Sequence, residues 1–217
     1  EDPRLDPPSD PGFIQIDDEG NVTGGQWNLW SFVPEAWQET PNFRQEEAVL
    51  GAGLHADRAW QRATGRDEVL IAVLDSGVRW GNRDLVNQYY LNRAELDGCR
   101  PKVDEGFEGD PFDVNGDGAF NVKDYGHFFG DSELARLDAA PGNGNGIIDP
   151  QDLIRHCSDG VDDDANGYLD DISGWDFFWN DNDPHDDTDF GHGNGEAQDS
   201  AAEGDNDRGG IGVCPGC

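Results

Sequence analysis

Val69-Leu-Ile-Ala-Val-Leu74, followed directly by Asp75-Ser-Gly77, is the stretch of sequence that decides the fold expected of this chain. Its six residues are all aliphatic, and charged or turn-forming residues bound them on both sides. An unbroken apolar run of this length is typical of a strand that is buried on both faces. Strands of that kind occur in parallel sheets with helices on either side. The sequence therefore predicts an α/β fold built on a parallel sheet.

The sequence before this predicted strand divides into an arm and the beginning of a packed domain. Residues 1–25 are rich in Pro, Asp and Gly, which predicts an extended arm. Residues 26–37 are aromatic enough to pack, and a helix is expected at about residues 45–64, where apolar side chains can share one face. We therefore expect a boundary near residue 25, with one domain over residues 26–217.

Regular periodicity fades after Asn92. Residues 97–190 are predicted to form a long acidic, glycine-rich insertion whose order depends on bound ions. Its apolar end, Gly174-Trp-Asp-Phe-Phe-Trp179, is expected to return to the core. A short helix is expected after His192.

The net charge of the chain limits the classes of partner that it is expected to bind. The 217 residues include 14 Lys and Arg against 47 Asp and Glu, a formal net charge of −33. This charge disfavours nucleic acid and anionic membrane surfaces, because both are bound through basic side chains. Aspartates clustered among Asn and Gly indicate ligation of a hard cation, with calcium as the leading candidate. Salt adaptation of the surface is the competing interpretation of the same composition.

The strongest cation motif is DVNGDGAFNVKD at residues 113–124. An EF-hand type of loop takes its ligands from positions 1, 3, 5, 7, 9 and 12, with Gly at position 6 for the sharp turn. Gly118 holds position 6 here. The predicted ligands are Asp113, Asn115, Asp117, the Ala119 carbonyl, Asn121 and Asp124.

A second stretch, PGNGNGIIDPQD at residues 141–152, fits the same register. Its position 1 is Pro141, which has no side-chain oxygen, so Asp138 or a water is expected to substitute. The predicted ligands are Asn143, Asn145, the Ile147 carbonyl, Asp149 and Asp152.

The third stretch runs from Asp162 to Asp171. Position 12 is Ser173, a poor ligand, so Asp171 or a more distant group is expected to complete the shell. The predicted ligands are Asp162, Asp164, Asn166, the Tyr168 carbonyl and Asp170. Two to three Ca²⁺ ions are therefore expected along the insertion, since so many carboxylates would repel one another without a cation.

Two further residues have the character of a catalytic site. Asp75 stands at the carboxyl end of the predicted strand, which is where open α/β sheets build their sites. A capping role for its side chain is the structural alternative. His192 lies in the glycine-rich segment Phe190-Gly-His-Gly-Asn-Gly195, which allows close approach of backbone or substrate. A single His in such a loop is otherwise usually a surface residue.

In this order, Asp75-Ser-Gly77 and Gly191-His-Gly193 resemble the first two catalytic blocks of the subtilisin-like serine proteases. The resemblance covers residues 26–217 apart from the inserted calcium loops, which resemble those of EF-hand and dockerin modules. It implies the N-terminal portion of a subtilisin-like α/β fold. The other segments that resemble this family are Gln26-Trp-Asn-Leu29, Ala59-Trp60, Asp84-Leu85, Asp162–Asp171 with Gly174-Trp-Asp-Phe177, Asp183-Pro-His-Asp-Asp187 and Gly210-Ile-Gly-Val-Cys-Pro215.

The resemblance implies that Asp75 orients the imidazole of His192, and that His192 acts as general base towards a serine nucleophile. Asn194 stands where this family has threonine, and no segment resembles the serine block or the oxyanion-hole asparagine. We therefore expect the serine on a remaining C-terminal part, in the same or a separate chain, and no activity from these residues alone. The implied partner is a polypeptide substrate.

The four cysteines, Cys99, Cys157, Cys214 and Cys217, allow three fully paired connectivities. A zinc site is disfavoured because Cys214-Pro-Gly-Cys217 offers two ligands with no convincing partner pair. We expect Cys99–Cys157 to bracket the first two calcium loops and Cys214–Cys217 to close locally. Calcium sites of moderate affinity suit millimolar extracellular calcium, and that compartment also permits disulfides, so secretion is expected.

Other classes of function fit less well. Gly51-Ala-Gly53-Leu-His-Ala56 matches a dinucleotide-binding fingerprint, but the strand that should precede it is weak. A haloacid-dehalogenase phosphatase would need a second Asp where Gly77 stands. A noncatalytic, calcium-stiffened scaffold, such as a filament or adhesion module, is the main alternative to a protease.

Overall fold

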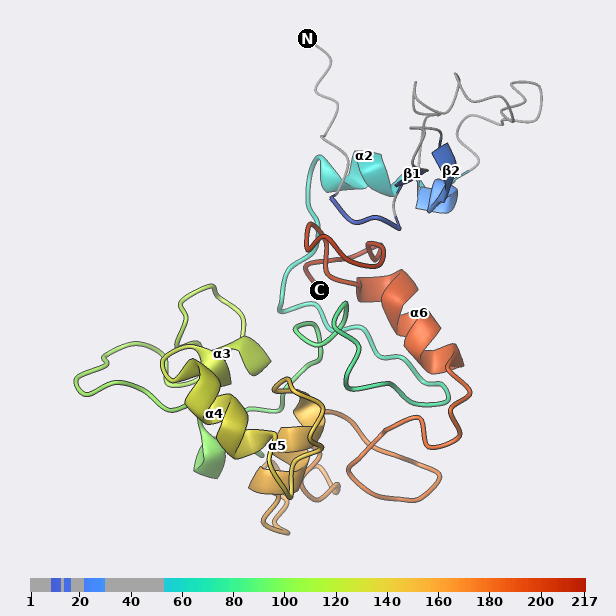
Figure 1. Cartoon of the computed structure of the whole chain (residues 1–217). Coiled ribbons are helices and arrows are strands. Elements are labelled where there is room, and N and C mark those ends of the chain that lie inside the picture. The colour runs from blue at the N-terminus through green and yellow to red at the C-terminus, as the bar shows by residue number, and fades with distance from the viewer. Residues whose placement is uncertain (1–8, 13, 17–21, 30–52) are drawn as a thin grey trace. The chain divides into compact units, whose positions relative to one another are not determined.

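The structure is a computed structural model that describes residues 9–12, 14–16, 22–29 and 53–217 (Figure 1). The chain forms two compact units. The terminal unit comprises residues 1–71 with residues 197–217, and the central unit comprises residues 72–196. No helix in the described parts of the chain is both long enough and apolar enough to cross a bilayer.

The described residues of the terminal unit form a pair of short strands and two short helices. Strand β1 (Ile14–Ile16) pairs antiparallel with β2 (Val22–Gly25), with Ile14 opposite Gly25 and an irregularity between Gln15 and Ile16. The 3-10 helix η1 (Trp27–Leu29) follows, and α2 spans Ala56–Trp60. The helix predicted for residues 45–64 is therefore much shorter in its described part, and residues 45–52 lie outside the described residues.

The core of the terminal unit joins the two ends of the chain. Leu29, Ala56, Trp60 and Ile211 are buried together. Gln26 donates its Nε2–H to the Ile211 carbonyl at 2.9 Å and accepts the Ile211 N–H at 2.8 Å. Trp60 donates its Nε1–H to the Val213 carbonyl at 2.9 Å. These bonds secure the segment that carries the Cys214–Cys217 disulfide.

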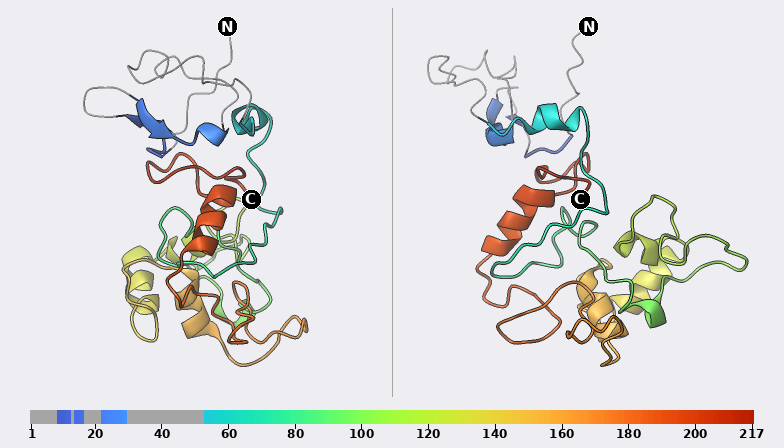
Figure 2. Two further views of the ribbon diagram at one scale, coloured as in Figure 1. Left: turned by 90° about the vertical axis from the view of Figure 1, so that its right-hand side faces the viewer. Right: turned by 180° about the vertical axis from the view of Figure 1, so that it is seen from behind.

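The central unit contains one 3-10 helix and a cluster of short α-helices. These are η2 (Asp97–Cys99), α3 (Val122–Gly126), α4 (Gly130–Leu137) and α5 (Pro150–Cys157). Helices α3, α4 and α5 lie side by side, as Figure 2 shows from two directions. A last helix, α6 (His192–Ala201), begins in this unit. The buried core consists of Trp80, Val86, Leu91, Leu96, Phe112, Val122, Tyr125, Leu137, Leu153, Ile154 and Ile172.

Helices α3 and α5 begin where the first two predicted calcium loops end. Asn121 is the N-cap of α3 and forms a reciprocal capping box with Asp124. Asp149 is the N-cap of α5 and forms the same box with Asp152, and Pro150 opens the helix. The side-chain oxygens of such boxes satisfy the backbone N–H groups of the first turn, which have no partner within the helix. The loop sequence itself therefore starts each helix.

The parallel-sheet prediction is wrong. Residues 69–74 form no strand, and Val69, Leu70 and Leu74 are 47%, 60% and 84% exposed. Among the described residues, β1 and β2 are the only paired strands, and they are antiparallel. Parallel pairing near Asp75 is limited to one isolated bridge between Val78 and His185. The chain is therefore not an α/β parallel-sheet protein, and the subtilisin-like fold class is overturned with it.

The physical reason lies in what a strand requires. An apolar run supplies a tendency to be buried, but a strand also needs neighbours to accept its backbone hydrogen bonds. The long acidic stretch after Asn92 supplies short helices and tight Asx turns, in which side-chain oxygens accept backbone N–H groups. No second apolar strand in the described chain lies against residues 69–74.

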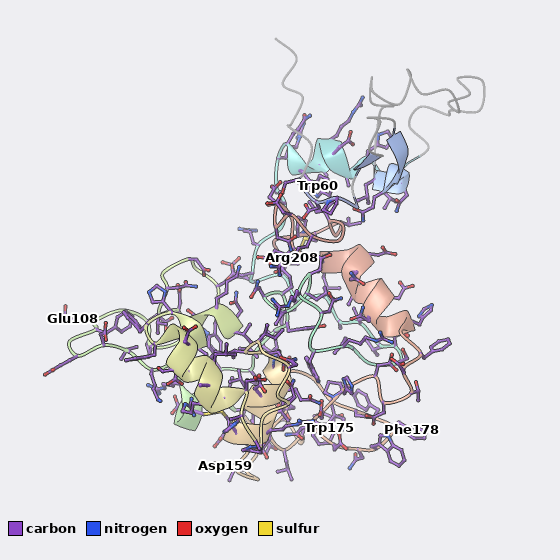
Figure 3. The ribbon with its side chains drawn as sticks, in the orientation of Figure 1. Trp60, Glu108, Asp159, Trp175, Phe178 and Arg208 are labelled. Carbon is purple, nitrogen blue, oxygen red and sulfur yellow. A yellow bond between two sulfur atoms is a disulfide. The ribbon has the colours of Figure 1, made fainter. Side chains whose placement is uncertain are left out.

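The apolar end of the insertion is also placed differently from the prediction. Phe177, Phe178 and Trp179 are 72%, 83% and 63% exposed, and Figure 3 shows Phe178 at the edge of the molecule. They do not return to the core. The backbone N–H groups of Phe178 and Trp179 donate to Asp176 Oδ1, so a local Asx-type turn determines where these side chains lie.

Both predicted disulfides are present. Cys99 pairs with Cys157 in the central unit, with 5.7 Å between their Cα atoms. Cys214 pairs with Cys217 in the terminal unit. The longer bridge joins η2 to the end of α5 and encloses the first two calcium loops in one covalent ring.

Candidate functional site

Asp75 and His192 come together across 117 residues of sequence. The Nδ1 atom of His192 lies 2.8 Å from Oδ2 of Asp75, within hydrogen-bond distance. The side chains are 23% exposed for Asp75 and 54% exposed for His192. The pair is therefore partly sheltered on the Asp side and open to solvent on the His side.

The turn at residues 75–77 fixes the aspartate. The Ser76 backbone N–H donates to Asp75 Oδ1 at 2.7 Å, which leaves Oδ2 for the histidine. That backbone bond, together with the bond to His192, holds the pKa of Asp75 below its ordinary value despite partial desolvation. An ionised Asp75 favours a proton on His192 Nδ1, and Nε2 is then the basic nitrogen. Nε2 lies 3.7 Å from Oε1 of Glu196, one turn along α6.

The segment before His192 is closed into a loop by Asp186. This buried carboxylate accepts the backbone N–H groups of Phe190 and Gly191 and the hydroxyl of Thr188. The Asp186 backbone N–H in turn donates to the Val78 carbonyl at 3.0 Å. The loop that precedes His192 is thus hydrogen-bonded to the segment that follows Asp75.

Close backbone approach sets the geometry of the pair. Gly193, in the first turn of α6, donates its N–H to Ser76 Oγ at 3.1 Å. A Cβ atom at Gly193 would lie 2.5 Å from the Gly77 carbonyl oxygen and 3.0 Å from the Asp75 Cβ. The 2.5 Å contact with the Gly77 backbone is not sterically possible without movement of the backbone, and the 3.0 Å contact is tighter than most Cβ contacts. The glycine beside His192 is therefore needed for the helix to reach the Asp75 turn.

The substitution Gly193→Ala is expected to separate His192 from Asp75 and to lower stability by about 1–3 kcal/mol, as overpacking usually does. Gly195→Ala is the matched control, since a Cβ there meets nothing within 4 Å and Ala favours helix by about 1 kcal/mol. Thermal melts and the NMR signal of the hydrogen-bonded His192 Nδ1–H are the measurements. Equal behaviour of the two variants would contradict the close approach described above.

The three predicted calcium loops share one hydrogen-bond frame. In each loop the position 5 backbone N–H donates to the side-chain oxygen of position 3, and the position 7 N–H donates to the side-chain oxygen of position 5. The distances are 2.8–3.0 Å in all three loops. The donor and acceptor pairs are Asp117 to Asn115 and Ala119 to Asp117, Asn145 to Asn143 and Ile147 to Asn145, and Asn166 to Asp164 and Tyr168 to Asn166.

The first position is also equivalent in the three loops. Asp113 Oδ2 accepts the Gly118 N–H at 3.1 Å, and Asp162 Oδ2 accepts the Gly167 N–H at 2.9 Å. In the second loop, Asp138 Oδ2 accepts the N–H of Gly146 at 3.1 Å. Asp138 thus makes the contact that Pro141 cannot make, which agrees with the substitution proposed from the sequence.

The carboxylate at position 12 closes the first two loops. Asp124 Oδ1 accepts the N–H groups of Val114 and Asn115 at 2.9 and 3.3 Å. Asp152 Oδ1 accepts the Asn143 N–H at 2.9 Å. In both loops the remaining oxygen completes the helix capping box. Position 12 therefore joins the start of each loop to the helix that follows it.

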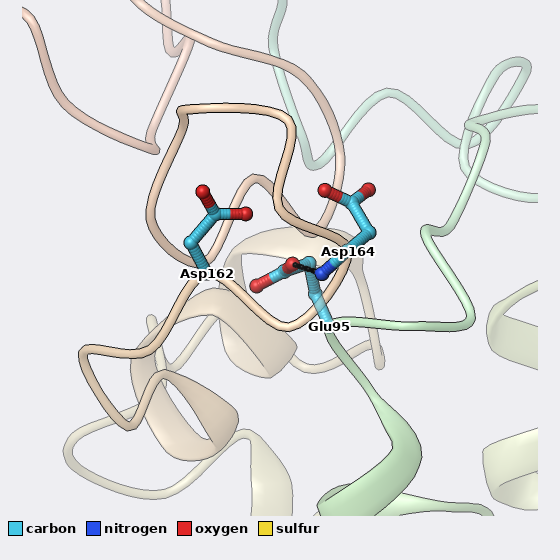
Figure 4. A group of neighbouring side chains, drawn as sticks. All are labelled: Glu95, Asp162 and Asp164. Carbon is cyan, nitrogen blue, oxygen red and sulfur yellow. Dashed lines mark hydrogen bonds between the residues drawn. The ribbon is translucent and has the colours of Figure 1, made fainter.

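In the third loop a residue from far upstream makes this contact. Glu95 Oε1 accepts the N–H groups of Asp163 and Asp164 at 2.9 and 3.2 Å, at positions 2 and 3 of the loop. Figure 4 shows the Glu95 carboxylate between Asp162 and Asp164. One ligand atom from each of these three residues lies within 4.8 Å of the others, and the cluster, with Glu95 buried, could hold a metal ion.

Two neighbouring amides and a fourth carboxylate surround this cluster. Asn92 donates its Nδ2–H to Asp164 at 2.9 Å and to Asp171 at 3.2 Å. Asn166 donates to the same two carboxylates at 3.1 and 3.0 Å. The Asp170 side chain, predicted as a ligand, instead accepts the backbone N–H groups of Asp159 and Gly160. Asp171, unlike the Asp170 side chain, therefore shares hydrogen-bond donors with the cluster.

Carboxyl pKa values are raised at the closing position of every loop. Burial is the first cause in each case, and neighbouring carboxylates add to it. Burial and Asp117 raise the pKa of Asp124. Burial, Asp149 and Asp138 raise the pKa of Asp152 to about 6. Burial, Asp171 and Asp164 raise the pKa of Glu95. A bound cation would favour the charged form of all three groups.

Sequence reasoning placed most of these groups but did not name Glu95. The spacing of the loops is local, so one window of sequence contains nearly all of their ligands. Glu95 lies outside that window, and the signal for it was the unsuitable Ser173 at position 12, which called for a more distant group.

No protein-family model matches this chain, and none of the curated proteins matches it significantly.

Proposed function

We propose that this chain is part of a secreted, calcium-dependent, subtilisin-like serine endopeptidase and contributes the aspartate and histidine of its triad. The observation that carries the proposal is the 2.8 Å contact between Asp75 and His192. The order of two sequence motifs predicted this pair, and 117 residues separate its members.

The chemistry assigned to the pair follows from its orientation. Asp75 holds the Nδ1–H of His192, and Nε2 takes the proton from a serine hydroxyl as its oxygen attacks the substrate carbonyl carbon. The same Nε2 then returns that proton to the leaving amine. The serine belongs to the remaining part of the gene product, in the same or a separate chain. Residues 75–78 and 186–193 supply the positioning.

Calcium has a structural role in this proposal. The loops offer carboxylate, amide and backbone oxygens, which are the ligands that Ca²⁺ prefers. Two to three ions would order the insertion that precedes His192. The two disulfides support the assignment to an extracellular compartment, where calcium is also abundant.

The test uses the full-length gene product with a peptide substrate and a fluorophosphonate probe that labels activated serines. His192→Ala is expected to lower kcat/KM by about 10⁴-fold or more, because the nucleophile loses its base. Asp75→Asn should cost about as much through the wrong tautomer. His127→Ala, an exposed histidine at the end of α3, is the control and should keep full activity. Activity unchanged in His192→Ala refutes the proposal.

A noncatalytic, calcium-stiffened scaffold is the second candidate. The observation that favours it is the shared frame of three loops, which occupies more of the central unit than the Asp75–His192 pair does. The two functions give opposite results with the probe. A full-length product that binds calcium but shows neither probe labelling nor peptide hydrolysis would be assigned to the scaffold class.

A further inference from the structure

We infer that Glu95 is a direct calcium ligand of the third loop and supplies from another segment the carboxylate that its twelfth position lacks. The inference rests on the calcium use proposed above and adds to it a specific residue and site. The local sequence of the loop shows only that Ser173 at position 12 is a poor ligand, and it does not identify the residue that takes its place.

The first observation is an unpartnered oxygen on a buried side chain. Glu95 is 4% exposed. Its Oε1 accepts two backbone N–H groups, whereas its Oε2 is buried and has no hydrogen-bond partner among the described residues. A buried polar atom left without a partner loses its hydration and gains nothing in return, and the loss is larger when the atom is charged. A cation at this oxygen would compensate for that loss.

The second observation is the direction in which this carboxylate lies. Ligand atoms of Glu95, Asp162 and Asp164 are within 4.8 Å of one another. Two oxygens that bind the same ion at 2.3–2.6 Å lie no more than about 5 Å apart. Figure 4 shows Glu95 reaching from its own segment to the two loop aspartates. The three carboxylates therefore already have a spacing that one ion can satisfy.

The third observation is the equivalence of Glu95 with the closing residues of the other loops. Asp124 accepts the N–H groups of positions 2 and 3 of the first loop at 2.9 and 3.3 Å. Glu95 accepts those of positions 2 and 3 of the third loop at 2.9 and 3.2 Å. Position 12 supplies a carboxylate ligand in loops of this type. Glu95 makes the same backbone contacts as Asp124, although it reaches them from outside the loop.

The donor set favours calcium over magnesium and zinc. The cluster offers carboxylate oxygens from Glu95, Asp162 and Asp164, with the amide of Asn166 beside them. Zinc prefers Cys and His ligands in a tetrahedral arrangement. Magnesium demands a near-ideal octahedron and keeps several waters, whereas calcium accepts six to eight oxygens in flexible geometry. A loop closed by a long side chain from a second segment suits the more tolerant ion.

The experiment compares calcium titrations of the purified chain by calorimetry, with CaCl₂ as the only ligand. Glu95→Gln is expected to remove one site, or to weaken it at least tenfold, while the sites of the other loops keep their affinities. Glu105→Gln is the matched control, because it makes the same change at an exposed position of the acidic insertion and should bind as the parent does. Asp162→Asn should remove the same site as Glu95→Gln, and the double variant should lose no more.

A conservative variant protects the test against misfolding. Glu95→Asp keeps the charge but shortens the side chain by one methylene, so it should weaken the site while its metal-free melting temperature stays close to that of the parent. Titrations of Glu95→Gln and Glu95→Asp that match the parent in site number and affinity overturn the inference and leave calcium binding by the other loops intact. A parent chain that binds no calcium overturns the calcium dependence in the proposed function as well.

Discussion

Removal of calcium with EGTA is expected to make residues 104–190 sensitive to proteases and to lower the melting temperature of the chain. The segment contains few buried aliphatic side chains, while ordering a residue costs about 1–2 kcal/mol of backbone entropy. Each ion contributes about 2.7 kcal/mol when its free concentration is 100 times its Kd. Two to three ions therefore supply about 5–8 kcal/mol, comparable to the whole stability of a small domain.

The order of the calcium loops also affects the Asp75–His192 pair. Asp186, which closes the loop before His192, follows the third calcium loop by only 15 residues of sequence (186 − 171). Added Ca²⁺ should restore both protease resistance and melting temperature, and Mg²⁺ should do so poorly. A melting curve that EGTA leaves unchanged would contradict the claim that bound calcium orders this segment. Salt adaptation would then explain the acidic composition.

Loss of the Cys99–Cys157 bridge is expected to lower the stability of the chain by an amount similar to the loss of its calcium ions. The bridge spans 58 residues of sequence, and closing a ring of that length in the unfolded chain corresponds to about 4 kcal/mol. Replacing both cysteines with Ala should therefore lower the free energy of unfolding by roughly that amount in saturating calcium. The measurement is urea unfolding followed by circular dichroism.

The bridge should also strengthen calcium binding at the third loop. Glu95 and Asp163 are 68 residues apart along the chain, but the path through the bridge is only about ten residues, four to Cys99 and six from Cys157. Without the bridge, the entropic cost of bringing Glu95 to Asp163 is about 1.7 kcal/mol higher than with it. The double Ala variant should therefore bind calcium at this loop more than tenfold more weakly. Replacing Cys214 and Cys217, only three residues apart, is the control and should leave calcium binding unchanged. Equal calcium affinity in both double variants would contradict this coupling.

Sequence reasoning located mainly those parts of the site whose residues lie close together in the sequence. The ligand spacing of loops 113–124 and 141–152 lies within single windows, and the same residues cap α3 and α5. The approach of His192 to Asp75 is not local, and it was predicted because the motifs around the two residues resemble consecutive blocks of one protease family. The contact itself is 2.8 Å in the structure.

The parts that could not be located depend on contacts between distant segments. The run at residues 69–74 has the composition of a buried strand, but composition does not specify which segment will pair with it. Glu95 belongs to no recognisable loop pattern, and only its backbone contacts to Asp163 and Asp164 connect it with the third loop. Pairing and ligation across long sequence separations are set by the packing of the whole unit, which a local window of sequence does not contain.

The exposure of residues 69–74 has a consequence for the behaviour of this chain at high concentration. A run of six aliphatic residues with high β-propensity and no Pro is the kind of segment that adds to a strand of another copy. The net charge of −33 opposes such contacts, because every copy repels every other. This repulsion weakens as counterions accumulate, since the screening length falls from about 10 Å at 0.1 M salt to about 3 Å at 1 M. The colloidal stability of the chain therefore depends on its charge, and the calcium ions that order its loops also remove part of that protection.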